Sequence, residues 1–396
     1  MESRRFMMPL RKAALVVGRR LVEFGEVSER PRLLQVSDFM EPVAYARRVR
    51  QEIDCYKAVE KVHELPEIFH FWSNRYVRPK LEEVLGVSGF PDLCIRYISR
   101  CARQAPRSIV EICSLGSGNG EIEVPIARAL VESGVDNFRF VCLDLNQSML
   151  NRALERAEAQ GLGRHFVFEV VDLAQWRSRR PVALVMAHHS LHHVVELEQV
   201  FQRVLEAIGD EGYFLVSDMV GRNGHMRWPE ALEIVRDIWK TMPDRYKYNH
   251  QLRRFEAEFD NWDASKEGFE GIRAQDILPL LLETFHFESF VAYGNLPDVF
   301  VDRSFGHNFD AECSADREFI DRLGAMNDQL VDQGILKPTQ MIAVMRTPQG
   351  SSPPPVCCYR HWTPAFCVRY PFLERRSSLG LGHPGSHSGG QESFHC

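Results

Sequence analysis

The stretch SIVEICSLGSGNGEIEVPIARAL (residues 108–130) decides the fold of this 396-residue chain. A β-branched, apolar run leads into three alternating glycines, Gly116, Gly118 and Gly120, and a helix-compatible segment follows at once. Glycines between a strand and a helix let the backbone approach a ligand without an obstructing Cβ, and they aim the free N–H groups of the helix at that ligand. The stretch therefore predicts a ligand-binding turn.

The charge next to this turn restricts the chemical class of the ligand. Glu121 and Glu123 open the helix, and carboxylates at that position would repel a pyrophosphate. The pattern therefore favours a nucleoside-like ligand that carries an ammonium or sulfonium group and lacks phosphates. The glycines alone leave two alternatives open, a purely structural turn and a dinucleotide site.

Outward from this turn, short apolar runs alternate with helical segments. Such an order indicates βαβ units and a parallel sheet, an α/β fold with helices on both faces. Right-handed crossovers place the carboxyl ends of the strands along one edge, where ligands bind. The expected strands end near Gly116, Asp144, Asp172, His188 and Asp218.

Changes in pattern predict the domain boundaries. Residues 1–106 read as a helical N-terminal region and residues 107–347 as the α/β domain. Within that domain, residues 221–273 interrupt the rhythm and predict an inserted helical lid. Residues 348–396 are rich in Pro, Ser, Gly, Cys and His without periodicity and predict a disordered tail. The basic, amphipathic start is interpreted as a helix on the domain, with a targeting peptide as the alternative.

Composition argues against several classes of protein. The formal net charge of −6 argues against a nucleic-acid surface, and no apolar run approaches the ~18 residues of a membrane span. Ten cysteines lie scattered without zinc-like pairs, so no disulfide or metal framework is predicted. We expect a cytoplasmic protein with a small-molecule partner; the oligomeric state is left open.

Four motifs in order carry a family resemblance: SLGSGNGE, LDLN, VVDL and SLHHV. Together they resemble class I S-adenosylmethionine (SAM) dependent methyltransferases over roughly residues 107–347. The resemblance implies a Rossmann-like, doubly wound, seven-stranded sheet whose final strand pair is a reversed hairpin. It also implies SAM as the cofactor.

The resemblance assigns cofactor positions along the ends of the first three strands. Asp144 would hold both ribose hydroxyls, and Asp172 would face the adenine amino group. Ser114 departs from the family, which often has an acidic residue there, so Ser114 and backbone carbonyls would hold the methionine ammonium. The full set of expected cofactor residues is Ser114, Gly116, Gly118, Gly120, Asp144, Leu145, Asp172 and Leu173.

The fourth expected strand ends in MAHHSLHHV (residues 186–194), which offers four histidines. His188 or His189 is the candidate general base, because histidine accepts a proton near neutral pH. The alternative is a role in the pocket wall or in structure, and the family resemblance implies that His192 and His193 pack beneath the cofactor. A zinc site is not predicted, because the pairs lack a carboxylate or Cys at regular spacing.

Polar and aromatic residues gather after the fifth strand, in SDMVGRNGHMRWPEAL. Such residues suit a polyhydroxylated substrate, and the candidates are Asp218, Arg222, Asn223, His225, Arg227 and Trp228. The alternative is that they pin the insertion to the sheet; Trp262, Asp263 and Arg273 have the same two interpretations. The patterns RNGHMRWPEAL and FEGIRAQDILPLL resemble a bacterial subgroup of methyltransferases.

The sequence thus predicts a SAM-dependent methyltransferase, with O-methylation of a small hydroxyl-rich molecule, a saccharide or secondary metabolite, as the expected reaction. N- and C-methylation stay open. An NAD-dependent oxidoreductase and a non-catalytic, methyltransferase-like protein that binds SAM or a partner are the rival hypotheses.

Overall fold

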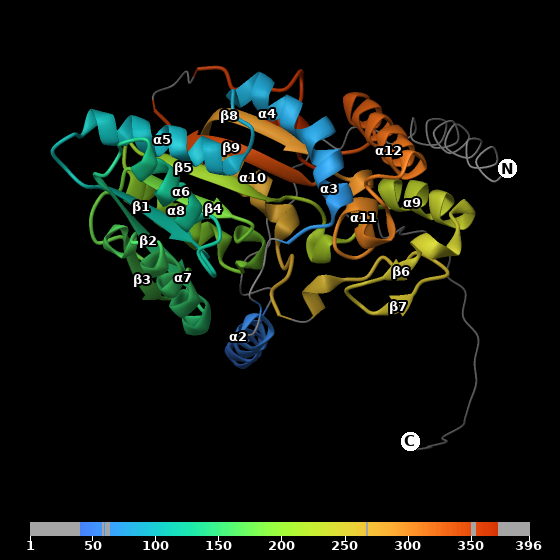
Figure 1. The fold of residues 1–396 in the computed structure, drawn as a ribbon, viewed down its shortest axis with the longest axis horizontal. Coiled ribbons are helices and arrows are strands. Elements are labelled where there is room, and N and C mark those ends of the chain that lie inside the picture. The colour runs from blue at the N-terminus through green and yellow to red at the C-terminus, as the bar shows by residue number, and fades with distance from the viewer. Residues whose placement is uncertain (1–39, 58, 60–63, 267, 350–353, 371–396) are drawn as a thin grey trace, which may run out of the picture.

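A single large sheet organises the computed structural model, which describes residues 40–57, 59, 64–266, 268–349 and 354–370 (Figure 1). Its eight strands follow the order β10-β8-β9-β5-β4-β1-β2-β3. Only β9 among them runs antiparallel to its neighbours, β5 and β8. The strands are β1 (Val110–Leu115), β2 (Phe138–Asp144), β3 (Phe166–Val170), β4 (Leu184–His188), β5 (Tyr213–Met219), β8 (His286–Tyr293), β9 (Gln340–Arg346) and β10 (Cys357–Cys358). The predicted Rossmann-like sheet with an antiparallel final pair is confirmed, with one strand more than expected.

The central strands are short apolar runs because helices cover both faces of the sheet. All residues of β4 but His188, and all of β5 but Met219, are buried. On one side α5 packs against α6 and β1, and α7 packs against β2 and β3. On the other, α8 packs against β4 and β5 and in turn contacts α10. The helices are α5 (Phe90–Gln104), α6 (Glu123–Glu132), α7 (Gln147–Ala159), α8 (Leu197–Ile208) and α10 (Ala274–Thr284).

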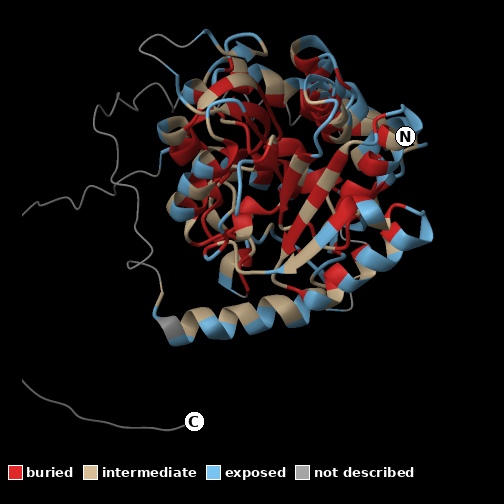
Figure 2. Cartoon of the chain, turned by 90° about the vertical axis from the view of Figure 1, so that its left-hand side faces the viewer, coloured by how far each residue is buried: buried red, intermediate tan, exposed pale blue. Residues whose placement is uncertain are grey.

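The described part of the predicted N-terminal helical region is helical. It comprises α2 (Pro42–Tyr56), α3 (Glu67–Trp72), the π-helical turn η3 (Ser73–Val77) and α4 (Arg78–Leu85), with α5 completing it. Residues 1–39, with the predicted amphipathic start, lie outside the described residues. Figure 2 shows α2 along one end of the domain with only exposed and half-buried positions. This surface helix is held by polar contacts, and these bear on the site below.

The segment after β5 carries α9 (Pro229–Thr241) and a two-stranded ribbon, β6 (Tyr248–Asn249) and β7 (Arg254–Phe255). α9 contacts α11 (Leu296–Val301), which packs on α12 (Ser314–Asp332). Figure 1 shows α9, β6 and β7 at the end of the molecule opposite β3 and α7. Most of the insertion therefore packs beside α11, at the end of the molecule opposite β3.

Part of the predicted disordered tail is folded, which corrects the prediction for residues 354–370. β10 pairs in parallel with β8, and α13 (Pro364–Cys367) follows it. Trp362 is fully buried and donates a hydrogen bond from Nε1 to Asp332 Oδ1 at 2.8 Å. A strand of two residues is too short to show periodicity, and a single tryptophan anchors the segment. The sequence therefore carries no pattern that predicts this folded segment. Residues 350–353 and 371–396 lie outside the described residues.

Within the described residues, no helix combines the length and the apolar character that crossing a membrane requires.

Candidate active site

A cavity of about 1040 Å³, counted with its open mouth, lies at the carboxyl ends of β1, β2 and β4. Eight of the sequence-predicted residues line it: Gly116, Gly118, Asp144, Leu145, Asp172, Leu173, His188 and His189. The other lining residues come from the same loops, from α2 and, at Phe269, from the end of the insertion. The structure therefore brings six of the eight expected cofactor residues and both candidate bases to one cavity.

The glycine turn needs its glycines for geometric reasons. Gly116 has φ +66°, and a Cβ there would lie 2.6 Å from the Cβ of Ser190. Gly118 has φ +53°, and its N–H donates to Asp144 Oδ2 at 2.9 Å. Gly120 does not line the cavity; a Cβ there would meet Ala153 of α7 at 3.1 Å. Gly120 thus serves close packing of the turn on α7 instead of the cavity.

Asp144 ends β2 and faces the cavity from a half-buried position. Besides Gly118 N–H, it accepts the N–H of Asn146 at Oδ1, at 2.8 Å. Burial raises the pKa of Asp144, and these two backbone hydrogen bonds oppose that rise. Asn146 in turn caps α7 by accepting the N–H of Ser148 at 3.0 Å. The carboxylate is therefore held in a fixed orientation by the turn on one side and the helix start on the other.

Asp172, which follows β3, has one carboxylate oxygen tied to its own loop and one to α2. Oδ1 accepts the N–H of Ala174 at 2.9 Å, and Oδ2 accepts the hydroxyl of Tyr45 at 2.8 Å. Leu173 lines the cavity beside it. The position expected to face an adenine is thus linked directly to the N-terminal helix.

Helix α2 covers the cavity, a role that the sequence analysis missed. Tyr45, Glu52, Ile53 and Tyr56 line the cavity from this helix. Arg48 fastens the helix to the end of the insertion, because its Nη1 donates to the carbonyls of Ser265 and Gly268, both at 2.6 Å. The cavity-lining positions recur at helical spacing, so the signal was an amphipathic face without any motif.

Ser114 does not line the cavity. It lies buried in β1 and donates its hydroxyl to Glu123 Oε1 at 2.5 Å. Glu123 is itself buried at the start of α6, and its Oε2 has no hydrogen-bond partner within the described part of the chain. Burial raises the pKa of Glu123 from 4.5 to about 7, although the Ser114 hydroxyl and backbone N–H groups lower it. The predicted cofactor contact of Ser114 is thus replaced by an internal one.

This pair predicts a pH-dependent stability. A carboxyl group whose pKa is higher in the folded state binds its proton more tightly there, so stability falls as the pH rises from about 4.5 to 7. A rise of the pKa from 4.5 to about 7 corresponds to about 3 kcal/mol. We expect Glu123→Gln to remove this loss, which urea denaturation at pH 5 and pH 8 measures. Glu155→Gln, an exposed change on α7, is the control; an equal pH dependence in wild type and Glu123→Gln would contradict the prediction.

The candidate bases occupy the β4 edge of the cavity in different settings. The ring of His188 stacks on Phe90 of α5, with centroids 5.1 Å apart and planes at 13°. His189 adopts φ +49°, and its N–H donates to the Ser217 carbonyl at 2.8 Å. The two rings lie perpendicular to each other, 4.7 Å apart. A strained backbone at His189 is of the kind that clusters at functional sites.

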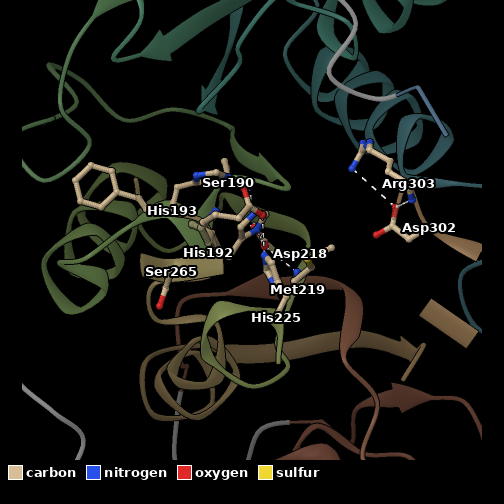
Figure 3. Close-up of polar contacts among 12 residues, drawn as sticks. Ser190, His192, His193, Asp218, Met219, His225, Ser265, Asp302 and Arg303 are labelled. Atoms are coloured by element: carbon tan, nitrogen blue, oxygen red, sulfur yellow. Dashed lines mark hydrogen bonds and ion pairs between the residues drawn. The ribbon is translucent and has the colours of Figure 1, made fainter. Parts of the chain in front are cut away.

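Asp218 organises the loop that carries the four histidines (residues 188–193, the histidine loop) and does not line the cavity. Its Oδ2 accepts the N–H groups of Ser190 and Leu191 at 3.0 and 2.8 Å, and its Oδ1 lies 2.5 Å from His192 Nδ1 (Figure 3). Burial by itself would raise the pKa of Asp218, but the His192 charge and hydrogen bonds hold it far below its usual range. Burial likewise opposes the charged form of His192, yet Asp218 and Glu270 raise its pKa to about 10. Asp218 is therefore a positioning residue, contrary to the expected substrate contact.

The remaining predicted substrate residues do not line the cavity either. Arg222 donates to the Arg227 carbonyl at 3.2 Å and lies over the Trp228 ring, 5.5 Å from its centroid. Arg227 donates to the carbonyls of Asn295 and His225, both at 2.8 Å. These contacts match the alternative interpretation, in which the residues tie the insertion to the sheet.

Asn223 and His225 connect the insertion to the α10 region. The Asn223 side chain accepts the N–H of Gln275 at 3.1 Å, and His225 Nε2 lies 2.7 Å from Glu270 Oε1. Arg273 is fully buried and forms ion pairs with Glu198 and with Asp276, each at 2.8 Å.

Trp262 and Asp263 also serve the insertion. Trp262 remains 43% exposed, and Asp263 accepts the N–H of Ser265 at 3.0 Å. Neither lines the cavity. The insertion therefore reaches the cavity through Phe269. Helix α2 has the covering role that the sequence predicted for the insertion.

Comparison with protein families matches residues 107–269 to the model described as a methyltransferase domain. This stretch belongs to the methyltransferase domain family. It contains the glycine turn, Asp144, Asp172 and the histidine loop, so the assignment to class I SAM-dependent methyltransferases, made from the motifs, is confirmed together with the enzyme class and the cofactor. A search of the curated proteins finds no match.

Solved structures of similar fold include methyltransferases of three kinds. An O-methyltransferase from the trans-AT PKS multienzyme of Brevibacillus brevis, in complex with S-adenosyl-L-homocysteine, is 11% identical over 64% of this chain and 71% of that one, with a TM-score of 0.36. The N-methyltransferase NodS from Bradyrhizobium japonicum WM9 is 10% identical over 76% and 100%, at 0.34. Geranyl diphosphate C-methyltransferase from Streptomyces coelicolor A3(2) is 11% identical over 76% and 98%, at 0.39.

Proposed function

We propose that the cavity under α2 is the SAM site and that the chain transfers the methyl group to a hydroxyl of a small, hydroxyl-rich molecule such as a saccharide or secondary metabolite. The carrying observation is the charge of the cavity. Its lining includes five carboxylates, Glu52, Glu121, Asp144, Asp172 and Glu196, and no Lys or Arg among the lining residues described. An acidic cavity suits a ligand that bears a sulfonium and an ammonium group.

The same charge opposes the dinucleotide alternative. A pyrophosphate needs N–H groups and cations around it, whereas Glu121 lines the cavity directly beside the glycine turn. Asp144 is suited to a cis-diol, because an ionised carboxylate accepts two hydrogen bonds and makes them stronger than a neutral acceptor does. These features support SAM over NAD.

The choice of a hydroxyl acceptor rests on the histidines at the β4 edge. Methyl transfer is an in-line displacement from an activated sulfonium, so alignment supplies much of the catalysis. A hydroxyl nucleophile must also lose its proton, and His188 and His189 line the cavity where a base could accept it. We assign the base role to one of these two residues.

Two measurements test this function. The full chain is first titrated calorimetrically with SAM and separately with NAD, and SAM-loaded protein is then screened against hydroxylated acceptors for release of S-adenosylhomocysteine. Binding of SAM without NAD, followed by turnover, is the expected result; binding of NAD, or of neither ligand, would overturn it.

His188→Ala or His189→Ala should keep SAM affinity and lose turnover, and turnover retained in both would remove the base assignment.

The covering role of α2 gives a further prediction. Arg48 fixes α2 through two carbonyls of the insertion and does not line the cavity, so Arg48→Ala should loosen the cover without changing a lining residue. We expect SAM affinity to fall roughly 10-fold, because hydrogen bonds from a charged donor contribute about 1.5–3 kcal/mol. Stopped-flow measurement should assign most of the loss to faster dissociation. Arg47→Ala, an exposed change on the same helix, should have no effect.

A further inference from the structure

A cluster of imidazoles converges on one carboxylate beside the cavity. His225 Nε2 lies 2.7 Å and His192 Nε2 3.5 Å from Glu270 Oε1. His193 Nε2 lies 3.4 Å from the other oxygen, Glu270 Oε2. The His192 ring centroid is 4.3 Å from that of His193 and 5.1 Å from that of His225. Figure 3 shows His192 and His225 meeting beside Asp218.

A second layer of carboxylates lies behind two of these rings, and it hydrogen-bonds the ring of His192. Asp218 Oδ1 lies 2.5 Å from His192 Nδ1, and Glu52 Oε1 lies 2.7 Å from His193 Nδ1. In metal sites, a ligating histidine almost always donates its other ring N–H to such a partner, which fixes the tautomer and the ring orientation. With Nδ1 engaged by Asp218, the nitrogen of His192 that can coordinate an ion is Nε2, the atom that faces Glu270.

The separations fit an ion held among three ligands. The ligand atoms of His192, His225 and Glu270 all lie within 4.8 Å of one another. Around a tetrahedral ion with bonds of about 2.0–2.1 Å, ligand atoms stand about 3.3 Å apart. The two distances from Glu270 Oε1, 2.7 and 3.5 Å, lie on either side of that value. Small shifts of the side chains would therefore admit an ion.

We propose that His192, His225 and Glu270 form a binding site for a divalent first-row transition metal ion, with Asp218 orienting His192. Two imidazoles and one carboxylate favour ions such as Zn²⁺ over Mg²⁺ or Ca²⁺, which prefer oxygen ligands. The Glu270 side chain is 36% exposed and that of His225 19%, so the site has an open side. Three protein ligands with an open position are typical of metal sites that bind a further ligand.

The open side of the metal site suits a role in binding the methyl acceptor, an inference that rests on the proposed function. His193 and Glu52 line the cavity and also contact the cluster. An ion there would lie next to the methyl-transfer edge, where it could hold an oxygen of the acceptor. It would thereby orient the acceptor and favour loss of its proton.

The test uses the full chain without a histidine tag, stripped with EDTA and dialysed. Zinc chloride is titrated calorimetrically, and bound zinc is counted by elemental analysis. We expect one zinc per chain and no measurable binding of magnesium chloride. Cobalt(II) chloride should give a visible d–d absorption band with the same stoichiometry. Substoichiometric zinc, or zinc affinity equal to that for magnesium, would overturn the proposal.

Substitutions of the proposed ligands test where the ion binds. Glu270→Gln and His225→Ala should each weaken zinc binding by at least about 100-fold, since even changes at outer-shell partners cost 10–100-fold. His307→Ala is the matched control, because this exposed histidine contacts the ring of His250 and is not one of the three proposed ligands. Circular dichroism of the zinc-free variants checks that they are folded. Unchanged zinc affinity in both ligand variants would also overturn the site.

Failure here is distinguishable from failure of the proposed function. Asp144→Ala should lose SAM and keep its zinc, since Asp144 belongs to the cavity and not to the cluster. A protein that binds SAM but not zinc overturns the metal site alone. A protein that binds zinc but not SAM overturns the proposed function alone.

Discussion

Replacing Asp218 with alanine is expected to lower the free energy of unfolding by about 3–5 kcal/mol, the cost of removing one partner from a buried ion pair. Asp218 is 1% exposed and accepts the N–H groups of Ser190 and Leu191 as well as the ring of His192. Alanine removes the acceptor of these three donors and also that of the Met219 N–H. Urea denaturation at pH 7 measures the loss as a lower midpoint at unchanged slope.

Two further variants make this expectation specific. Asp218→Asn keeps the shape and one acceptor oxygen, so it should lose less than the alanine variant. Asp210→Ala, an exposed change in the turn before β5, should stay within about 0.5 kcal/mol of wild type. A loss below about 1 kcal/mol for Asp218→Ala would show that water or a neighbouring side chain replaces the carboxylate.

The part of the fold that the sequence predicts well is the part that local patterns determine. Each central strand is an apolar run because helices cover both faces, and each ends at a polar or glycine position at one edge. The ends at Gly116, Asp144, Asp172 and His188 reach the cavity as expected. Position in the chain and the alternation of strand and helix suffice for that result.

What the sequence does not predict depends on contacts between distant segments. The cover of the cavity comes from α2, and the polar contacts that hold it, such as that of Arg48 with Gly268, join residues more than two hundred positions apart. Residues 354–370 also depend on a tertiary contact, because Trp362 donates its hydrogen bond to Asp332, 30 positions earlier in the chain. The cavity-lining residues of α2 recur at helical spacing but form no motif, and residues 354–370 have neither a periodic pattern nor a motif.

The histidine loop shows the same limit inside the site. Its four histidines look alike in sequence, but the structure separates His188 and His189, which line the cavity, from His192, which faces away toward Asp218. Ligand spacing within the loop predicted no metal site, because the remaining ligands, His225 and Glu270, arrive from the insertion. A spacing rule works only when the ligands share one local segment.

Asp144→Ala is expected to weaken SAM binding by about 100-fold or more. A charged acceptor for both ribose hydroxyls contributes about 1.5–3 kcal/mol for each hydrogen bond, and a loss of about 3 kcal/mol in total lowers the affinity roughly 100-fold. The variant also loses the acceptor for Gly118 and Asn146 N–H, which hold the glycine turn against β2. Calorimetric titration with SAM measures the change directly.

Asp144→Asn separates the two contributions. The amide keeps one oxygen that can accept from Gly118 or Asn146, but it cannot serve as a charged acceptor for a diol, so its affinity should lie between those of wild type and the alanine variant. Thermal denaturation without ligand shows whether the turn itself has loosened. Unchanged SAM affinity in the alanine variant would place the cofactor elsewhere, because no other carboxylate of the cavity accepts a hydrogen bond from the glycine turn among the contacts of the described residues.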